Sequence, residues 1–177
     1  MSKGSNTTRT GGAGTRSTTT NGASSSENSF LFRGTMQERD NPTASGIILS
    51  QHNDRFRLDT EIATEGYNTT VTTTLREGDI GRRAVLSTKN YRGNFADSVM
   101  FEGHVVPRTQ MLAIKEARSQ TASIQNKAND QIKQWRKDDN EEYNKSIRRY
   151  KYSLDNGFME KSSYDNAIRR AKEQYKW

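Results

Sequence analysis

The sequence contains no cysteine, which excludes disulfide bonds, thiolate metal sites and cysteine nucleophiles. Only 30% of its 177 residues are hydrophobic, against an average of roughly 45–50%, so we expect a small core. No apolar run approaches the roughly 18 residues of a membrane span, and the opening stretch MSKGSNTTRT has no apolar segment typical of a signal peptide. We therefore expect no membrane partner and no signal-directed secretion. We expect a protein that acts in a cytoplasm or within a particle assembled there.

Catalytic and cofactor motifs are also missing. The sequence has no P-loop, no GxGxxG before a helix, no HExxH and no GxSxG. Its two histidines, His52 and His104, lie near carboxylates, as a general base or a metal ligand would. Two histidines among scattered carboxylates are also what chance supplies, so we assign both a structural role. We predict a protein that is not an enzyme and that has no cofactor and no metal site.

Composition divides the chain into three predicted parts: residues 1–29, 30–107 and 108–177, with net charges of +2, −1 and +6. The first part is rich in Ser, Thr, Gly and Asn, and it has almost no apolar side chain to bury. Such a segment cannot offset the entropy lost on ordering, so we predict a disordered tail. The positive charge of the protein is therefore concentrated in the last part.

The middle part is predicted to form a small antiparallel β-sheet. Apolar and polar residues alternate in several short segments, and glycines suited to turns separate them. The five predicted strands are GIILSQ (46–51), RFRLDTEIAT (55–64), TTVTTTLR (69–76), RRAVLST (82–88) and SVMFEGHVV (98–106). A sheet of this size has a marginal core unless another element covers one of its faces.

The last part is predicted to be helical, beginning at Pro107, because no Gly or Pro follows until Gly157. A stripe of mostly apolar residues recurs every 3.64 residues, which matches one straight helix. The stripe consists of Ile114, Ala117, Thr121, Ile124, Ala128, Ile132, Trp135, Asp139, Tyr143, Ile147, Tyr150 and Leu154. We expect Gly157 to end this helix as a left-handed C-cap.

A second, shorter helix is predicted after Gly157. Ser162 and Asp165 resemble a capping box at its start, and its apolar positions are Tyr164, Ile168, Ala171 and Tyr175. The short connection folds it back antiparallel onto the long helix. The predicted fold class is therefore α+β: a small antiparallel sheet, a long helix and a C-terminal helical hairpin.

A nine-residue repeat lies in this hairpin. YNKSIRRYK at 143–151 and YDNAIRRAK at 164–172 share five residues. The antiparallel arrangement predicts that six basic residues lie at one level of the hairpin: Arg148, Arg149, Lys151, Arg169, Arg170 and Lys172. These residues, with nearby tyrosines, are candidates for binding nucleic acid or another anionic partner. They are also what two solvated helix faces contain, with the apolar members of the repeat serving only as packing.

Two functions are compatible with these features. The first is a non-enzymatic structural or assembly protein that self-associates or binds another protein through its long helix, for example in a virus-like or phage particle. The candidate packing residues are Ile132, Trp135, Tyr143, Ile147, Tyr150, Tyr164, Ile168 and Tyr175. The second is a nucleic-acid-binding accessory protein that uses the basic residues of the hairpin.

Overall fold

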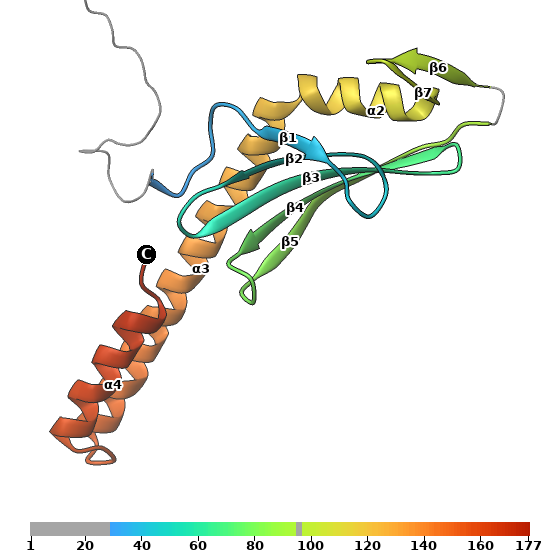
Figure 1. The fold of residues 1–177 in the computed structure, drawn as a ribbon. Helices are drawn as coiled ribbons and strands as arrows, with labels where there is room; N and C mark the ends of the chain where they lie inside the picture. The colour runs from blue at the N-terminus through green and yellow to red at the C-terminus, as the bar shows by residue number, and fades with distance from the viewer. Residues whose placement is uncertain (1–28, 95–96) are drawn as a thin grey trace, which may run out of the picture. The chain divides into compact units, whose positions relative to one another are not determined.

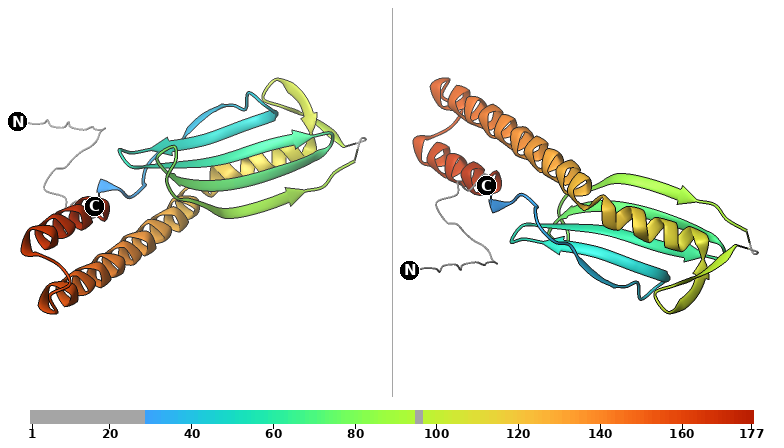
Figure 2. Two further views of the ribbon diagram at one scale, coloured as in Figure 1. Left: turned by 90° about the horizontal axis from the view of Figure 1, so that it is seen from below. Right: turned by 90° about the horizontal axis from the view of Figure 1, so that it is seen from above.

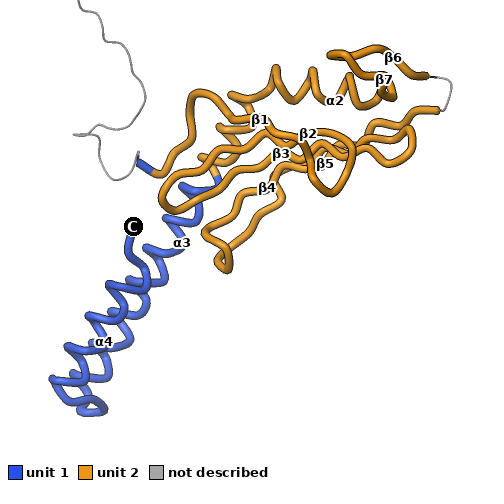
Figure 3. The backbone as a smooth tube through the Cα atoms, viewed as in Figure 1, with its two compact units in different colours: residues 1–29, 131–177 blue, residues 30–130 orange. Residues whose placement is uncertain are grey.

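A computed structural model describes residues 29–94 and 97–177, so nearly all of the predicted tail lies outside the described residues. The chain divides into two compact units (Figure 3). One unit is residues 30–130, and the other contains residues 131–177 together with 1–29, of which only Ser29 is described. The fold class is α+β, as predicted, with a five-stranded antiparallel sheet, a long helix and a C-terminal helix.

The sheet of the first unit is a simple antiparallel meander in which each strand pairs with the next (Figure 1). Four of its strands correspond to the first four predicted segments. The structure adds a short edge strand, which its four polar residues QERD did not indicate. The strands are β1 (Gln37–Asp40), β2 (Ser45–His52), β3 (Phe56–Glu65), β4 (Asn68–Glu77) and β5 (Arg83–Tyr91).

The segment 98–106, predicted as a single strand, is instead a hairpin of β6 (Ser98–Phe101) and β7 (His104–Pro107), which forms its own two-stranded sheet. The chain reverses at Glu102 and Gly103, which have φ angles of 49° and 85°. Two consecutive positive φ angles are typical of the tight turn that suits a two-residue hairpin loop. The prediction was wrong because the apolar residues around this turn continue the alternation of a strand.

Helix α2 (Arg108–Ser119) covers one face of the sheet, and among the described residues of this unit no helix or strand lies over the other face (Figure 2). The covered face contributes Phe56, Leu58, Ile62 and Leu75, all at most 1% exposed. Threonines occupy the same interior: Thr60 and Thr73 hydrogen-bond to each other, and Thr69 donates to Thr109 of α2. Paired hydroxyls thus fill core positions that a more hydrophobic chain would give to aliphatic side chains.

The helix predicted from Arg108 onward is not continuous, because α2 ends at Ser119 and α3 (Thr121–Asp155) begins after Gln120. At the break, the Ser119 hydroxyl donates to the Glu116 carbonyl and the Thr121 hydroxyl to the Arg118 carbonyl. Such hydroxyl–carbonyl bonds compete with the backbone bonds of a helix. The prediction of one helix was therefore wrong at Gln120, although α3 alone is roughly 52 Å long at 1.5 Å per residue.

The second unit is a pair of antiparallel helices, the last part of α3 and α4 (Lys161–Gln174), lying side by side (Figures 1 and 2). As predicted, α3 ends at a left-handed glycine: Gly157 has a φ of 74°. The Phe158 N–H donates to the Ser153 carbonyl and the Gly157 N–H to the Leu154 carbonyl, which is the Schellman pattern. The predicted capping box was wrong, because α4 begins before Ser162 and its N-cap residue, Glu160, makes no side-chain capping bond.

Candidate binding surfaces

The nine-residue repeat forms the contact between α3 and α4. The small residues at its fourth position, Ser146 and Ala167, are both buried, as is Ala171 one turn further along α4. Because the helices are antiparallel and the two copies lie at the same level, equivalent positions of the repeat are related by an approximate two-fold axis. The repeat therefore places equivalent small residues of the two helices against each other, with approximate two-fold symmetry.

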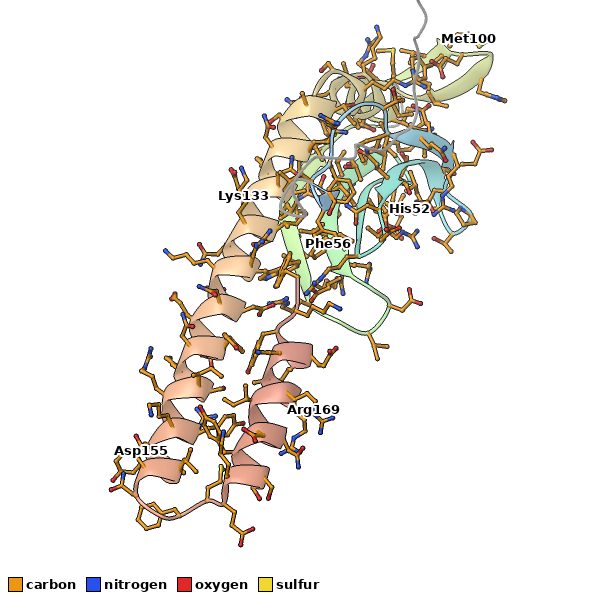
Figure 4. All side chains as sticks on the ribbon, turned by 90° about the vertical axis from the view of Figure 1, so that its left-hand side faces the viewer. His52, Phe56, Met100, Lys133, Asp155 and Arg169 are labelled. Atoms are coloured by element: carbon orange, nitrogen blue, oxygen red, sulfur yellow. The ribbon has the colours of Figure 1, made fainter. Side chains whose placement is uncertain are left out.

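The same symmetry determines where the arginines lie. Arg148 and Arg169 follow the buried small residues by two positions, or about 200°, and so point away from the partner helix. Figure 4 shows Arg169 projecting from α4 on the side away from α3. Arg149 and Arg170 follow by three positions and lie together on one face of the hairpin. The structure therefore does not bring the four arginines into one cluster.

The six predicted basic residues are all exposed. Arg149 stacks over the Tyr150 ring with 5.7 Å to its centre, Lys151 lies 3.4 Å from Asp155, and Arg169 donates to Asn166 at 2.9 Å. Within residues 29–94 and 97–177, the side chains of Arg148, Arg170 and Lys172 make no hydrogen bond or ion pair. Three of the six are thus unpaired, and the pairs of the other three are solvent-exposed.

The predicted packing residues fall into two groups. Ile132 and Trp135 are buried, with exposed fractions of 2% and 8%. The others are half-buried: Tyr143, Ile147, Tyr150, Tyr164, Ile168 and Tyr175. The C-terminal residue is also tied to α3, since the Trp177 indole donates to the Asp139 carboxylate at 2.8 Å.

A second basic surface, which the sequence did not reveal, lies on the open face of the sheet. His52 of β2 is the direct cross-strand neighbour of Arg57 in β3, Arg57 of Arg76 in β4, and Arg76 of Arg83 in β5. We call these four residues the basic row. Their side chains share one face because they are directly paired, and the core residues Leu58 and Leu75 next to them point to the other face.

Only one member of the basic row has an acidic partner within the described residues. Arg57 Nε lies 2.9 Å from Asp59 Oδ2, whereas the side chains of His52, Arg76 and Arg83 make no ion pair or hydrogen bond there. Asp59 is only 6% exposed, and its other carboxylate oxygen, Oδ1, has no hydrogen-bond partner among these residues. A buried acceptor without a donor is unusual in a folded protein.

Two other arginines beside the row form ion pairs with the carboxylate of Glu77. Arg55 Nε and Arg82 Nε each lie 2.8 Å from its carboxylate. Burial by itself would raise the pKa of Glu77, but the hydrogen bonds from Arg82 and Arg55 outweigh it and lower the pKa below its ordinary value of 4.5. Arg76 and Arg83 have no such carboxylate, so their charge is available to a ligand.

A pocket of about 560 Å³ opens at the end of this face. His52, Arg57 and Arg76 of the basic row line it, together with Arg39 of β1. Asp54 and Asp79, in the turns beside the strands, contribute carboxylates to the same pocket. The pocket is therefore lined by both basic and acidic side chains.

Among the described residues, neither histidine lies in a cluster of metal-binding side chains. In the part of the chain that the structure describes, no group of three or more His, Asp or Glu side chains is placed to hold a metal ion. His52 and His104 are both exposed. No helix among the described residues is long and apolar enough to cross a membrane.

Comparisons with protein-family models, with curated proteins and with solved structures found no match to this chain.

Proposed function

We propose that the protein is a non-enzymatic structural or assembly protein that self-associates through its helical unit, in a cytoplasm or within an assembled particle. The observation that carries the proposal is the small core of that unit. Within residues 131–177 the buried side chains are only Ile132, Trp135, Ser146, Ala167 and Ala171. A folded unit of this size with so few buried residues usually depends on oligomerisation, metals or disulfides, and this chain has no cysteine.

The repeat supplies a surface for a second copy. Ile147 follows the buried Ser146, and Ile168 follows the buried Ala167. Because the helices are antiparallel, this step turns both isoleucines toward the same face of the hairpin, opposite the face of Arg149 and Arg170. Both are half-buried, so part of their apolar surface is available to another helix pair.

Light scattering after size exclusion, on the full chain at two salt concentrations, tests the proposal. We expect a discrete mass that is a multiple of 20.1 kDa at both salts. The double variant Ile147→Asn/Ile168→Asn is expected to have a lower mass. Arg148→Asn/Arg169→Asn, one position later in each copy of the repeat, is the matched control and keeps the wild-type mass. A wild-type monomer at both salts contradicts self-association.

A second candidate is binding of nucleic acid by the hairpin. Its support is that Arg149 and Arg170 lie on one face at nearly the same level, where both guanidinium groups are exposed. Only these two of the four arginines share a face, which weakens the cluster predicted from the sequence. A variant that removes the hairpin arginines, described below, separates this candidate from binding elsewhere on the protein.

A further inference from the structure

The basic row places like charges side by side across the sheet. Arg57, Arg76 and Arg83 occupy directly opposed positions on three neighbouring strands, with His52 at the end. Directly opposed like charges destabilise a sheet. An ion pair with a carboxylate would relieve the repulsion, yet among the described residues only Arg57 of the row forms one. The row therefore keeps a destabilising arrangement that an anionic ligand would relieve.

The dimensions of the row favour a ligand with several negative charges. Neighbouring strands are 4.7–4.9 Å apart, so the row extends for about 14 Å. Arg39 of β1 lies on the same face. Its cross-strand partner, Ile48, is four positions before His52 in β2, and residues an even number of positions apart share a face of the sheet. A single phosphate ion contacts one or two such side chains, whereas a chain of phosphates contacts all of them.

The rest of the face indicates which polyanion fits. The polar positions around the row include the hydroxyls of Ser50, Thr70, Thr72 and Thr88 and the carboxylate of Glu61. Serine and threonine hydroxyls commonly donate to the phosphate oxygens of nucleic acids. In the described sheet, the aromatic residues Phe56 and Tyr91 belong to the covered face, so the open face has no ring on which an unpaired base would stack.

From this arrangement we infer that the open face of the sheet binds the sugar-phosphate backbone of double-stranded nucleic acid. Arg39, Arg76 and Arg83 contact phosphates directly. Arg57 is held in place by its ion pair with the buried Asp59. Since no side chain is placed for stacking, binding depends on charge and shape and not on base sequence.

The test is fluorescence anisotropy with a labelled duplex of about 20 base pairs, in a salt titration of the full chain. The sheet variant is Arg39→Gln/Arg76→Gln/Arg83→Gln, which spares the Arg57–Asp59 pair. The matched control is Arg148→Gln/Arg149→Gln/Arg170→Gln, which removes the same charge from the hairpin. Because each phosphate contact contributes about −0.9 to the slope of log K against log salt, the sheet variant should lose about 2.7 from the magnitude of this slope. Between 50 and 200 mM salt, the wild-type affinity should then fall about 40-fold more than that of the variant.

The outcomes separate the alternatives. Loss of slope in the sheet variant, with the control unchanged, supports the inference. Loss only in the hairpin variant moves the site to the helices, and equal loss in both reduces it to net charge, so either result overturns the inference. No duplex binding by the wild type at 50 mM salt also overturns it. Vesicles containing an anionic phospholipid are a second probe, and preferential loss of vesicle binding in the sheet variant would identify lipid headgroups as the ligand instead.

Two measurements keep the result interpretable. Thermal unfolding of the sheet variant should occur at or above the wild-type midpoint, because the substitutions remove like-charge repulsion. Loss of binding then cannot be attributed to unfolding. The inference is independent of self-association, since a monomer with an intact sheet is still expected to bind duplex.

Discussion

Glu38 of β1 and Arg118 of α2, eighty residues apart in the chain, form a two-point ion pair. Arg118 Nη2 lies 2.5 Å from Glu38 Oε1, and its Nε lies 3.0 Å from Oε2. The same guanidinium also binds Glu102, in the turn between β6 and β7. The hydrogen bonds that Arg118 donates to Glu38 and then to Glu102 raise the pKa of Arg118, and they lower the pKa of Glu102. One side chain thus connects an edge strand and a separate hairpin to α2.

Replacing Arg118 with Gln is therefore expected to destabilise the first unit. The pair is partly exposed, so the loss in unfolding free energy should be about 1 kcal/mol and should shrink at high salt. Chemical denaturation at low and high salt measures it. The control is Arg148→Gln, which removes an exposed arginine that has no partner in the described part of the chain. An equal effect of the two substitutions would show that the Arg118 contacts contribute no stability.

Much of the fold could be predicted because its signals are local. The alternation Phe56, Leu58, Ile62 predicted the face of β3 that is buried, and Gly157 predicted the end of α3. The break at Gln120 was not predictable from glycine or proline, because it depends on hydroxyls that bond to the preceding turn. The turn at Glu102–Gly103 was hidden by apolar residues on both sides.

The basic row illustrates why the sheet surface could not be found in the sequence. The members of the basic row lie on four strands that three turns separate in the sequence. They become neighbours only through the strand register. The hairpin arginines, by contrast, could be predicted as a candidate site because they are adjacent in the sequence. Adjacent residues on a helix point about 100° apart, so Arg148 and Arg149 diverge. A pairing register, unlike a repeat, is a property of the folded chain.

Gly46 is a position where only glycine fits. Its φ is 144°, and a Cβ there would lie 2.0 Å from the Ile62 carbonyl oxygen. We expect Gly46→Ala to cost several kcal/mol of unfolding free energy, since both the backbone strain and the clash with β3 oppose it. Gly66→Ala is the control: its φ is 64°, but no atom lies within 4 Å of the added Cβ, so strain alone should cost about 1 kcal/mol. Comparable losses in the two variants would mean that β2 shifts to relieve the clash.

The hydroxyls of Thr60 and Thr73 satisfy each other in the core, at 3.0 Å. Thr60→Val leaves the Thr73 hydroxyl buried without this partner, which should cost about 1–3 kcal/mol. The double variant Thr60→Val/Thr73→Val removes both hydroxyls and should recover much of that loss, because no buried polar group is left unpaired. Denaturant unfolding of the two single variants and the double variant completes the cycle. Additive losses would show that the two hydroxyls contribute independently.

Glu77 should make the stability of the sheet unit sensitive to acid. Hydrogen bonds from Arg82 and Arg55 lower its pKa in the folded protein, so below pH 4.5 the unfolded chain binds more protons at this group than the folded chain does. The stabilisation from Glu77 is therefore fully present above pH 4.5 and is lost as the pH falls through the folded-state pKa. Glu77→Gln cannot form the ion pairs at any pH, so it should be less stable than wild type at pH 7.

The difference between wild type and Glu77→Gln should therefore be large at pH 7 and small near pH 3, as measured by thermal unfolding across this range. Glu102 and Glu116 also have lowered pKa values, from hydrogen bonds with Arg118 and with Lys89, and their acid sensitivity is common to both proteins. Subtracting the stability curve of Glu77→Gln from that of wild type therefore leaves the contribution of Glu77 at each pH. Glu173→Gln, on the exposed surface of α4, is the control and should follow the wild-type curve. A wild-type advantage that persists unchanged to pH 3 would mean that Glu77 acts through packing and not through its charge.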